Sequence, residues 1–216
     1  MSEKALIGQK AQEFCDDLWK RGDFWDFESS EYERARCARL LTRLDGRRYA
    51  RALEIGCGAG YFTRLLAGLA DQIVAFDISP AAIARARTLG ADLKTVDFRV
   101  ANAMDYEWRA DGPWDLVVFT DAMCYLGWLY SFFDVAWFAS ELFAATRRGG
   151  RFLLANTMDE INDKLLLPYI IRTYRDLFLN VGFRLEAEEI FRGTKNSVDF
   201  EILISLFAKA PAEGTV

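Results

Sequence analysis

A glycine turn is the clearest stretch of this chain whose residue types and spacing could bind a ligand. LEIGCGAG places Gly56, Gly58 and Gly60 directly after a short apolar run that is typical of a buried strand. Alternating glycines let the backbone leave a strand, turn sharply and present N–H groups at the start of a helix. We interpret the turn as a place where a ligand approaches the backbone closely. A tight turn with nothing bound is the alternative.

Asp77 ends the next apolar run, at a position where an acid could contact the same ligand. The carboxyl ends of neighbouring parallel strands form the usual binding edge of such sheets, and a carboxylate there accepts from both ribose hydroxyls. Asp77 could instead cap the following helix, but Ser79 already occupies that place. The turn is not the dinucleotide fingerprint G-x-G-x-x-G, because Tyr61 stands where its third glycine belongs.

Asp121 and Tyr125 are the candidate catalytic residues. Asp121 follows the apolar run 114–120, and Tyr125 comes about one helical turn later. A carboxylate can hold the ammonium group of a substrate and accept its proton through water. A tyrosine hydroxyl can orient the lone pair of the amine that results. Capping of the next helix by Asp121 and core packing of Tyr125 are the alternatives.

The elements that position these residues alternate between strand and helix. Polar turns separate short apolar runs from segments of helical periodicity, and this pattern predicts a parallel sheet with right-handed crossovers. A capping box, Ser30 with Glu33, begins an earlier helix. Further helices are expected over 80–89, over 132–146 with an end at Gly149-Gly150, and over 164–179. The expected strands are 52–55, 73–76, 98–101, 114–120, 151–156, 183–190 and 200–208. A turn at 192–197 joins the last two strands into an antiparallel hairpin.

Composition narrows the function further. The 216 residues are 52% hydrophobic and carry a net charge of -5, which suits one α/β domain and disfavours a nucleic-acid partner. The scattered cysteines, Cys15, Cys37, Cys57 and Cys124, indicate a reducing compartment, so we expect a cytoplasmic protein without a membrane span. The absence of histidine excludes Ser-His and Cys-His catalysis and His-ligated zinc, and we expect no metal site.

Together these motifs resemble the class I S-adenosylmethionine-dependent methyltransferases. The family pattern ExGxGxG matches Glu54 and the three glycines, the acid after the second strand matches Asp77, and the fourth strand with its acidic tip matches residues 114–121. The resemblance implies a Rossmann-like, mostly parallel sheet of seven strands in the order 3-2-1-4-5-7-6, with the last strand antiparallel. It also implies S-adenosyl-L-methionine as cofactor and S-adenosyl-L-homocysteine as product.

The same resemblance assigns further contacts to the donor. The family usually has an aspartate after the third strand that meets the adenine amino group, whereas this chain has Asn102, whose carbonyl can still accept that hydrogen bond. Met104 would cover the adenine ring. The alternative for Asn102 is a solvated loop residue without a ligand contact. Neighbouring positions complete the expected donor contacts: Ile78, Ala103 and Thr120.

The N-terminal stretch WDFESSEYERAR is similar to the start of the NodS-like branch of this family. In that branch N-terminal elements form a lid over the donor, which implies that Arg36 pairs with the methionine carboxylate and that Trp25 flanks the donor. A surface helix with solvated salt bridges is the alternative. Gly22-Asp23-Phe24 departs from the aspartate and proline that the branch has here.

The resemblance implies methylation of a small amine-bearing molecule such as an amino sugar. O-methylation of a small natural product is the alternative, and an NAD-dependent oxidoreductase or a non-catalytic binding module is disfavoured. We expect a helical lid over residues 1–46, a Rossmann-like core over 47–210 and a flexible tail over 211–216. A monomer or a homodimer is expected.

Overall fold

The computed structural model describes residues 3–159 and 164–211. The chain divides into two compact units, residues 1–106 and residues 107–216. The first unit holds the whole expected lid together with the glycine turn and Asp77, and the second holds Asp121 and Tyr125. Of the tail expected over 211–216, residues 212–216 lie outside the described residues.

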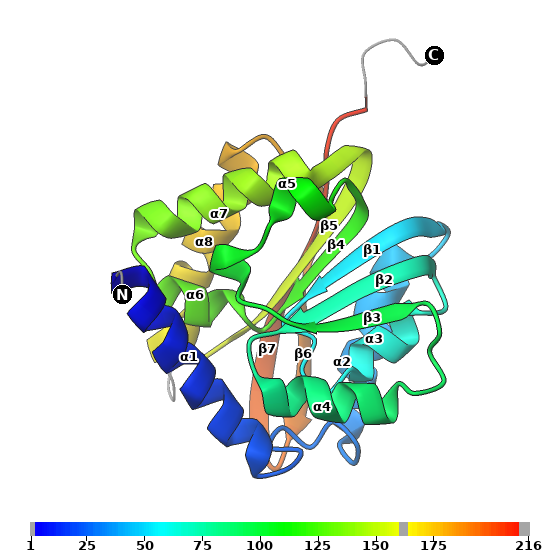
Figure 1. The fold of residues 1–216 in the computed structure, drawn as a ribbon, viewed down its shortest axis with the longest axis vertical. Helices are drawn as coiled ribbons and strands as arrows, with labels where there is room; N and C mark the ends of the chain where they lie inside the picture. Colours follow the sequence, from blue (N-terminus) through cyan, green and yellow to red (C-terminus); the bar gives the residue numbers. More distant parts are fainter. Residues whose placement is uncertain (1–2, 160–163, 212–216) are drawn as a thin grey trace. The chain divides into compact units, whose positions relative to one another are not determined.

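Three parallel strands form the sheet of the first unit, in which β2 lies between β1 and β3 (Figure 1). The strands are β1 (Tyr49–Ile55), β2 (Ala70–Asp77) and β3 (Val96–Val100). The last four residues of β1 and the last five of β2 are buried, which explains why both read as continuous apolar runs. Consequently the glycine turn, which follows β1, and Asp77, which ends β2, lie at the carboxyl ends of neighbouring strands.

Helices of the first unit begin and end at local signals in the sequence. In α4 (Pro80–Leu89) Ser79 is the N-cap, proline occupies the first turn and Gly90 is the C-cap. In α2 (Glu31–Leu44) the Ser30 hydroxyl accepts from the N–H of Glu33, as the capping box predicts. The remaining helices are α1 (Glu3–Lys20), α3 (Tyr61–Leu66) and the 3-10 turn η1 (Ala103–Asp105).

The second unit contains a mixed sheet of four strands. Its strands are β4 (Trp114–Thr120), β5 (Thr146–Met158), β6 (Arg184–Lys195) and β7 (Val198–Ala208), of which β4 and β5 are parallel and β7 runs antiparallel to β5 and β6. Its helices are α5 (Trp108–Asp111), α6 (Met123–Leu129), α7 (Phe132–Ala145), η2 (Lys164–Leu166) and α8 (Pro168–Asn180).

The strand order along the sheet is β3-β2-β1-β4-β5-β7-β6, with β7 antiparallel to its neighbours. This order confirms the predicted Rossmann-like fold class. The predicted hairpin of the last two strands is confirmed as well.

Three predicted boundaries were wrong. Gly149 and Gly150 do not end α7 but lie within β5, where they exchange backbone hydrogen bonds with Lys209. The helix expected from residue 164 is interrupted before Pro168, which lacks the N–H that a helix interior needs. The expected turn over 192–197 is only two residues long, because Asn196 and Ser197 adopt positive φ and the strands continue up to them.

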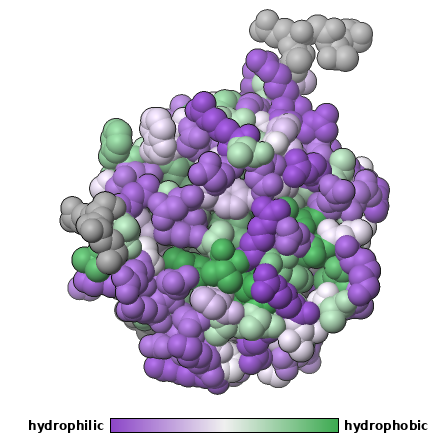
Figure 2. All heavy atoms as spheres, viewed as in Figure 1, coloured by the Kyte–Doolittle hydropathy of each residue, from purple (hydrophilic) through white to green (hydrophobic). Residues whose placement is uncertain are grey.

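Hydrophilic residues cover most of the face drawn in Figure 2. Among residues 3–159 and 164–211, no helix combines the length and the apolar character needed to cross a bilayer.

Candidate functional site

The glycine turn links the end of β1 to the start of α3. Gly56, Gly58 and Gly60 have φ values of +71°, +53° and +82°, which residues with a Cβ rarely adopt. The N–H groups of Gly56 and Cys57 donate to the carbonyl of Phe76 at 2.8 and 3.0 Å, so the turn is fixed to β2. The three glycines are therefore required by backbone conformation, as predicted from their spacing.

The carboxylate of Asp77 is buried and holds the turn from the other side. One oxygen accepts from the N–H of Gly58 at 3.0 Å, and the other accepts from the N–H of Ser79 at 2.9 Å. Burial raises the pKa of Asp77 above its usual range, and these backbone hydrogen bonds oppose the shift. The helix cap is Ser79, whose hydroxyl accepts from Ala82, so capping does not explain Asp77.

Glu54 places a second carboxyl group beneath the turn. Its side chain is 1% exposed, and its Oε2 atom has no hydrogen-bond partner within the described residues. Burial raises the pKa of Glu54 to about 8; the Thr63 hydroxyl opposes this shift, whereas the nearby Asp77 carboxylate adds to it. A cationic group bound beside these two acids would lower their pKa values and favour their charged forms.

Helix α1 covers the glycine turn with Trp19. A Cβ on Gly58 would lie 2.6 Å from the Trp19 ring, so this glycine is also needed for packing within the protein. Trp19 packs with Ala59 and Ala82, and Trp25 joins this cluster with its ring centroid 5.1 Å from that of Trp19. Trp25 thus packs against a cluster that includes Ala59 of the turn, and its contact with a donor stays a prediction.

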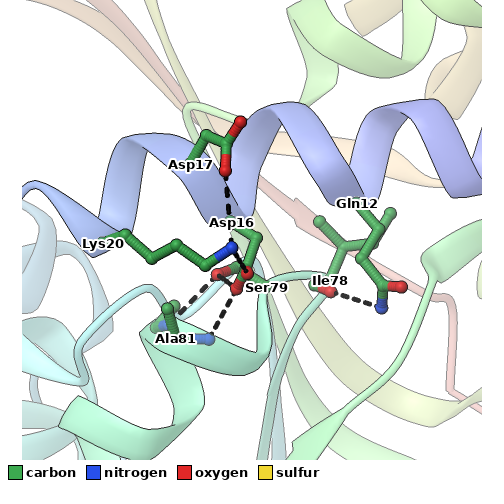
Figure 3. Close-up of polar contacts among 8 residues, drawn as sticks. Gln12, Asp16, Asp17, Lys20, Ile78, Ser79 and Ala81 are labelled. Carbon is green, nitrogen blue, oxygen red and sulfur yellow. Dashed lines mark hydrogen bonds and ion pairs between the residues drawn. The ribbon is translucent and has the colours of Figure 1, made fainter.

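Polar side chains fasten α1 to the start of α4 (Figure 3). Asp16 accepts from the Ser79 hydroxyl at 2.9 Å and from the N–H of Ala81 at 2.7 Å. Gln12 donates to the carbonyl of Ile78 at 3.0 Å, and Lys20 forms an ion pair with Asp16 at 2.9 Å. Helix α1 is therefore anchored at the end of β2, directly after Asp77.

Sequence reasoning missed this part of the site. It predicted a helical N-terminus but assigned no role to Gln12, Asp16 or Trp19. A signal was present, since Ala11, Cys15 and Trp19 recur at intervals of one helical turn and mark a buried face of α1.

Arg36 lies on the buried side of α2 together with Glu33. The two side chains are each 8% exposed and form an ion pair with 2.9 Å between Nε and Oε2. The Arg36 guanidinium also lies 5.5 Å from the ring centroid of Phe27. The alternative of a solvated surface pair is wrong, because both charges are buried.

The segment after β3 forms the short turn η1. The Asn102 carbonyl oxygen accepts from the N–H of Met104 at 3.0 Å, and its amide donates to Asp105 at 3.1 Å. Ala103 and Met104 are buried. Asn102 therefore caps its own turn.

In the second unit, Asp121 follows β4 with a positive φ of 50°. Its Oδ1 atom accepts from the N–H and the hydroxyl of Thr157, at 2.7 and 2.8 Å. The N-cap of α6 is Ala122, without a side-chain hydrogen bond. The alternative role of Asp121 as a helix cap is therefore wrong, and Thr157 is a partner that the sequence did not predict.

Tyr125 on α6 is partly buried and packs against a cluster that includes Cys124, Met158 and Ile171. Core packing, the alternative role of Tyr125, therefore buries part of its side chain. Thr120, the last residue of β4, and Ile78, the residue after Asp77, are also partly buried.

The residues of the first unit fit an S-adenosyl donor. Their chemistry combines a glycine turn with the buried carboxyl groups of Asp77 and Glu54 beside it. The partnerless oxygen of Glu54 leaves acceptor capacity within this set.

Residues 53–154 match the sequence profile of a family described as the methyltransferase domain. This segment is similar to methyltransferase domains. This domain begins just before the glycine turn and ends within β5, so it includes Asp77 and Asp121. The match confirms the predicted resemblance to S-adenosylmethionine-dependent methyltransferases.

Curated relatives of the methyltransferase domain include the nodulation protein S of Bradyrhizobium diazoefficiens, 32% identical over 106 residues, which are 48% of this chain and 49% of that protein. A probable S-adenosylmethionine-dependent methyltransferase of Mycolicibacterium smegmatis is 31% identical over 157 residues, 68% of this chain and 56% of that protein. The matched segment thus spans about half the length of these relatives.

Solved structures confirm the fold over nearly the whole chain. The N-methyltransferase NodS from Bradyrhizobium japonicum WM9, in complex with S-adenosyl-L-homocysteine, superposes with a TM-score of 0.76 and 19% identity. The superposition covers 92% of this chain and 97% of that chain, so the similarity includes elements outside the methyltransferase domain match.

Proposed function

We propose that this protein is an S-adenosylmethionine-dependent methyltransferase that acts on a small molecule. The observation that carries the proposal is the fixed glycine turn joined to the buried Asp77 carboxylate, within the segment that matches a methyltransferase domain. The donor, when bound, supplies a methyl group on a sulfonium. Every other requirement falls on the residues of this chain.

We propose the following contacts to the donor. Asp77 accepts hydrogen bonds from the ribose hydroxyls of the donor. Glu54 and the glycine turn bind the cationic end of the donor. Arg36 pairs with the donor carboxylate, and Trp25 flanks the donor. The adenine ring contacts Asn102, Ala103 and Met104 after β3. Ile78 and Thr120 complete the set.

We propose an amine as the methyl acceptor, such as the amino group of an amino sugar. Nodulation protein S relatives and the N-methyltransferase NodS support this class of acceptor. Asp121 holds the ammonium form and receives its proton through water, while Tyr125 orients the nitrogen lone pair. Alignment of nucleophile and methyl group supplies most of the rate, so no strong base is needed. The absence of histidine in the chain suits this chemistry.

O-methylation is the second candidate. The ubiquinone biosynthesis O-methyltransferase of Xanthomonas oryzae is 35% identical over 69 residues, and this match covers 32% of the chain. A hydroxyl acceptor needs a base to remove its proton, and Asp121 is the candidate for that role.

We further propose that residues 1–46 act as a lid and residues 47–210 as the catalytic core. The fastening of α1 by Asp16 and Gln12 supports the lid. We propose a cytoplasmic monomer or homodimer. The charge of -5 makes nucleic acid a poor partner.

The acceptor is tested by incubating the protein with methyl-labelled donor and a panel of amino sugars and phenols. We expect label in the amino sugars, and Asp121→Ala should abolish most of the transfer. Exclusive labelling of phenols would overturn the amine proposal and favour O-methylation. A variant at an exposed acid, Asp199→Ala on β7, is the matched control and should leave transfer unchanged.

A further inference from the structure

Asp121 has an unusual backbone conformation at the end of β4. Its φ of 50° is costly for a residue with a Cβ, and such strain persists only where surrounding interactions enforce it. The Asp121 N–H donates to the carbonyl of Ala155 at 2.9 Å, which extends the parallel pairing of Thr120 with Ala155 by one bond. The backbone of β5 therefore fixes the position of the Asp121 Cα.

Thr157 then fixes the direction of the Asp121 side chain. Its N–H and its hydroxyl both donate to the same carboxylate oxygen, at 2.7 and 2.8 Å. Two donors on one oxygen define the plane of the carboxylate more tightly than one donor does, and hydrogen bonds to an ionised group are stronger than neutral ones. Thr157 is partly buried, so water competes only in part for these bonds.

Asn156, the neighbour of Thr157, holds the start of α6. It is 1% exposed, and its carbonyl oxygen accepts from the N–H of Cys124 at 3.3 Å. The residue at the N-cap position of α6, Ala122, supplies no such bond, so Asn156 provides the cap from β5. The Asn156 amide donates to the Thr157 carbonyl at 2.8 Å, which links the two contacts. Helix α6 carries Tyr125.

We propose that Thr157 is a positioning residue for methyl transfer, which acts through Asp121 and is supported by Asn156. Thr157 orients the Asp121 carboxylate, which contacts the acceptor. Asn156 fixes the start of α6, the helix that carries Tyr125. This inference rests on the proposed function, since it takes Asp121 as the residue that contacts the acceptor.

Thr157→Val tests the inference, because it removes the hydroxyl and keeps the shape of the side chain. We expect the kcat of methyl transfer to fall by roughly ten- to a hundredfold, the effect of one hydrogen bond to a charged group. The affinity for S-adenosyl-L-homocysteine should not change. Thr157→Ser keeps the hydroxyl and should restore most of the rate.

A double variant separates positioning from general structure. In an Asp121→Ala background, Thr157→Val should cause no further loss, because the side chain on which it acts is gone. The matched control is Thr194→Val, since the Thr194 hydroxyl donates to a carboxylate oxygen of Asp199 at 2.6 Å in the β6-β7 hairpin. It should leave kcat unchanged.

The outcomes distinguish the inference from the proposed function. An unchanged kcat in folded Thr157→Val, or an equal loss in both backgrounds, would overturn the inference while wild-type transfer stands. If Thr157→Val does not fold, a rate in Thr157→Ser far below that of the wild type would also overturn it. Wild-type protein that transfers no methyl group would overturn both.

Discussion

The carboxylate of Asp77 accepts a hydrogen bond from the N–H of Gly58 at 3.0 Å, which joins the end of β2 to the turn that follows β1. The bond crosses between neighbouring strand ends, so the acid and the glycine turn form one rigid unit. The side of Gly58 that a Cβ would occupy lies against Trp19 of α1. Gly58, in the turn after β1, therefore contacts both β2 and α1, which are distant from it in the sequence.

Gly58→Ala should destabilise the protein through both backbone strain and a clash. Gly46 has a similar positive φ of +77° but no atom within 4 Å of a built Cβ, so Gly46→Ala isolates the strain. We expect Gly58→Ala to lower the free energy of unfolding by about 1 to 3 kcal/mol more than Gly46→Ala, the usual cost of overpacking. Denaturant unfolding measures both. Equal losses would show that Trp19 moves aside at no cost.

Asp16→Ala should weaken the attachment of α1 to the start of α4. It removes acceptors for the Ser79 hydroxyl and the Ala81 N–H, at a cost of about 1 to 3 kcal/mol in the free energy of unfolding. Asp17→Ala is the matched control, because Asp17 is 68% exposed and pairs only weakly with Lys20. Comparable losses in both variants would contradict the role of Asp16.

The contribution of Asp16 should also depend on pH. The hydrogen bond from Lys20, and then that from the Ala81 N–H, lower the pKa of Asp16 below its ordinary value of 3.8. Its stabilising effect is thus complete above this value and is lost as the pH falls through the lower pKa of the folded state. The difference between wild type and Asp16→Ala should shrink in acid. A difference that stays constant down to acid unfolding would contradict this expectation.

Glu54 should give the opposite pH dependence. Burial raises the pKa of its carboxyl group from 4.5 to about 8, so the folded state binds this proton more tightly than the unfolded state. This stabilisation is complete below the unfolded pKa and is lost as the pH rises through the folded one. Glu54→Gln, which stays neutral, should gain stability relative to wild type between about pH 5 and pH 8.

Unfolding free energies measured across this pH range test the role of Glu54. The exposed Glu13 provides the matched control Glu13→Gln, which should follow the wild-type curve. Parallel curves for Glu54→Gln and wild type would show that Glu54 titrates normally in the folded protein.

Arg36→Ala should cost both stability and donor affinity. Removal of the guanidinium takes the Arg36 partner away from the buried Glu33 carboxylate, which typically costs about 3 to 5 kcal/mol. The double variant Glu33→Gln with Arg36→Met should recover most of this stability but should still bind S-adenosyl-L-homocysteine weakly. Calorimetry on the double variant therefore separates the two effects. Wild-type affinity in that variant would remove Arg36 from the proposed donor site.

The fold was predictable because its signals are local and repeated. Each of the strands β1, β2 and β4 is a short apolar run with a turn signal after it, and Ser79-Pro80 and Ser30 begin their helices as expected. One error arose where strand pairing overrides a local signal. Gly149 and Gly150 look like a helix stop, but their backbone groups pair with Lys209, a partner that lies far along the chain.

The candidate site was predictable only where a motif carries it. Gly56, Gly58, Gly60 and Asp77 follow from spacing, and the structure joins them by direct hydrogen bonds. Thr157 and Asp16 could not be found in this way, because a lone threonine or aspartate has no distinctive pattern. Their importance comes from tertiary contacts with Asp121 and Ser79.

Calorimetry with S-adenosyl-L-homocysteine tests the central claim most directly. The account predicts that the wild-type protein binds this product while NAD does not bind, and that Asp77→Ala weakens binding by at least about tenfold through loss of the ribose contact. Asp71→Ala, at the exposed opposite end of β2, should bind like the wild type. Binding of NAD without binding of S-adenosyl-L-homocysteine would contradict the account.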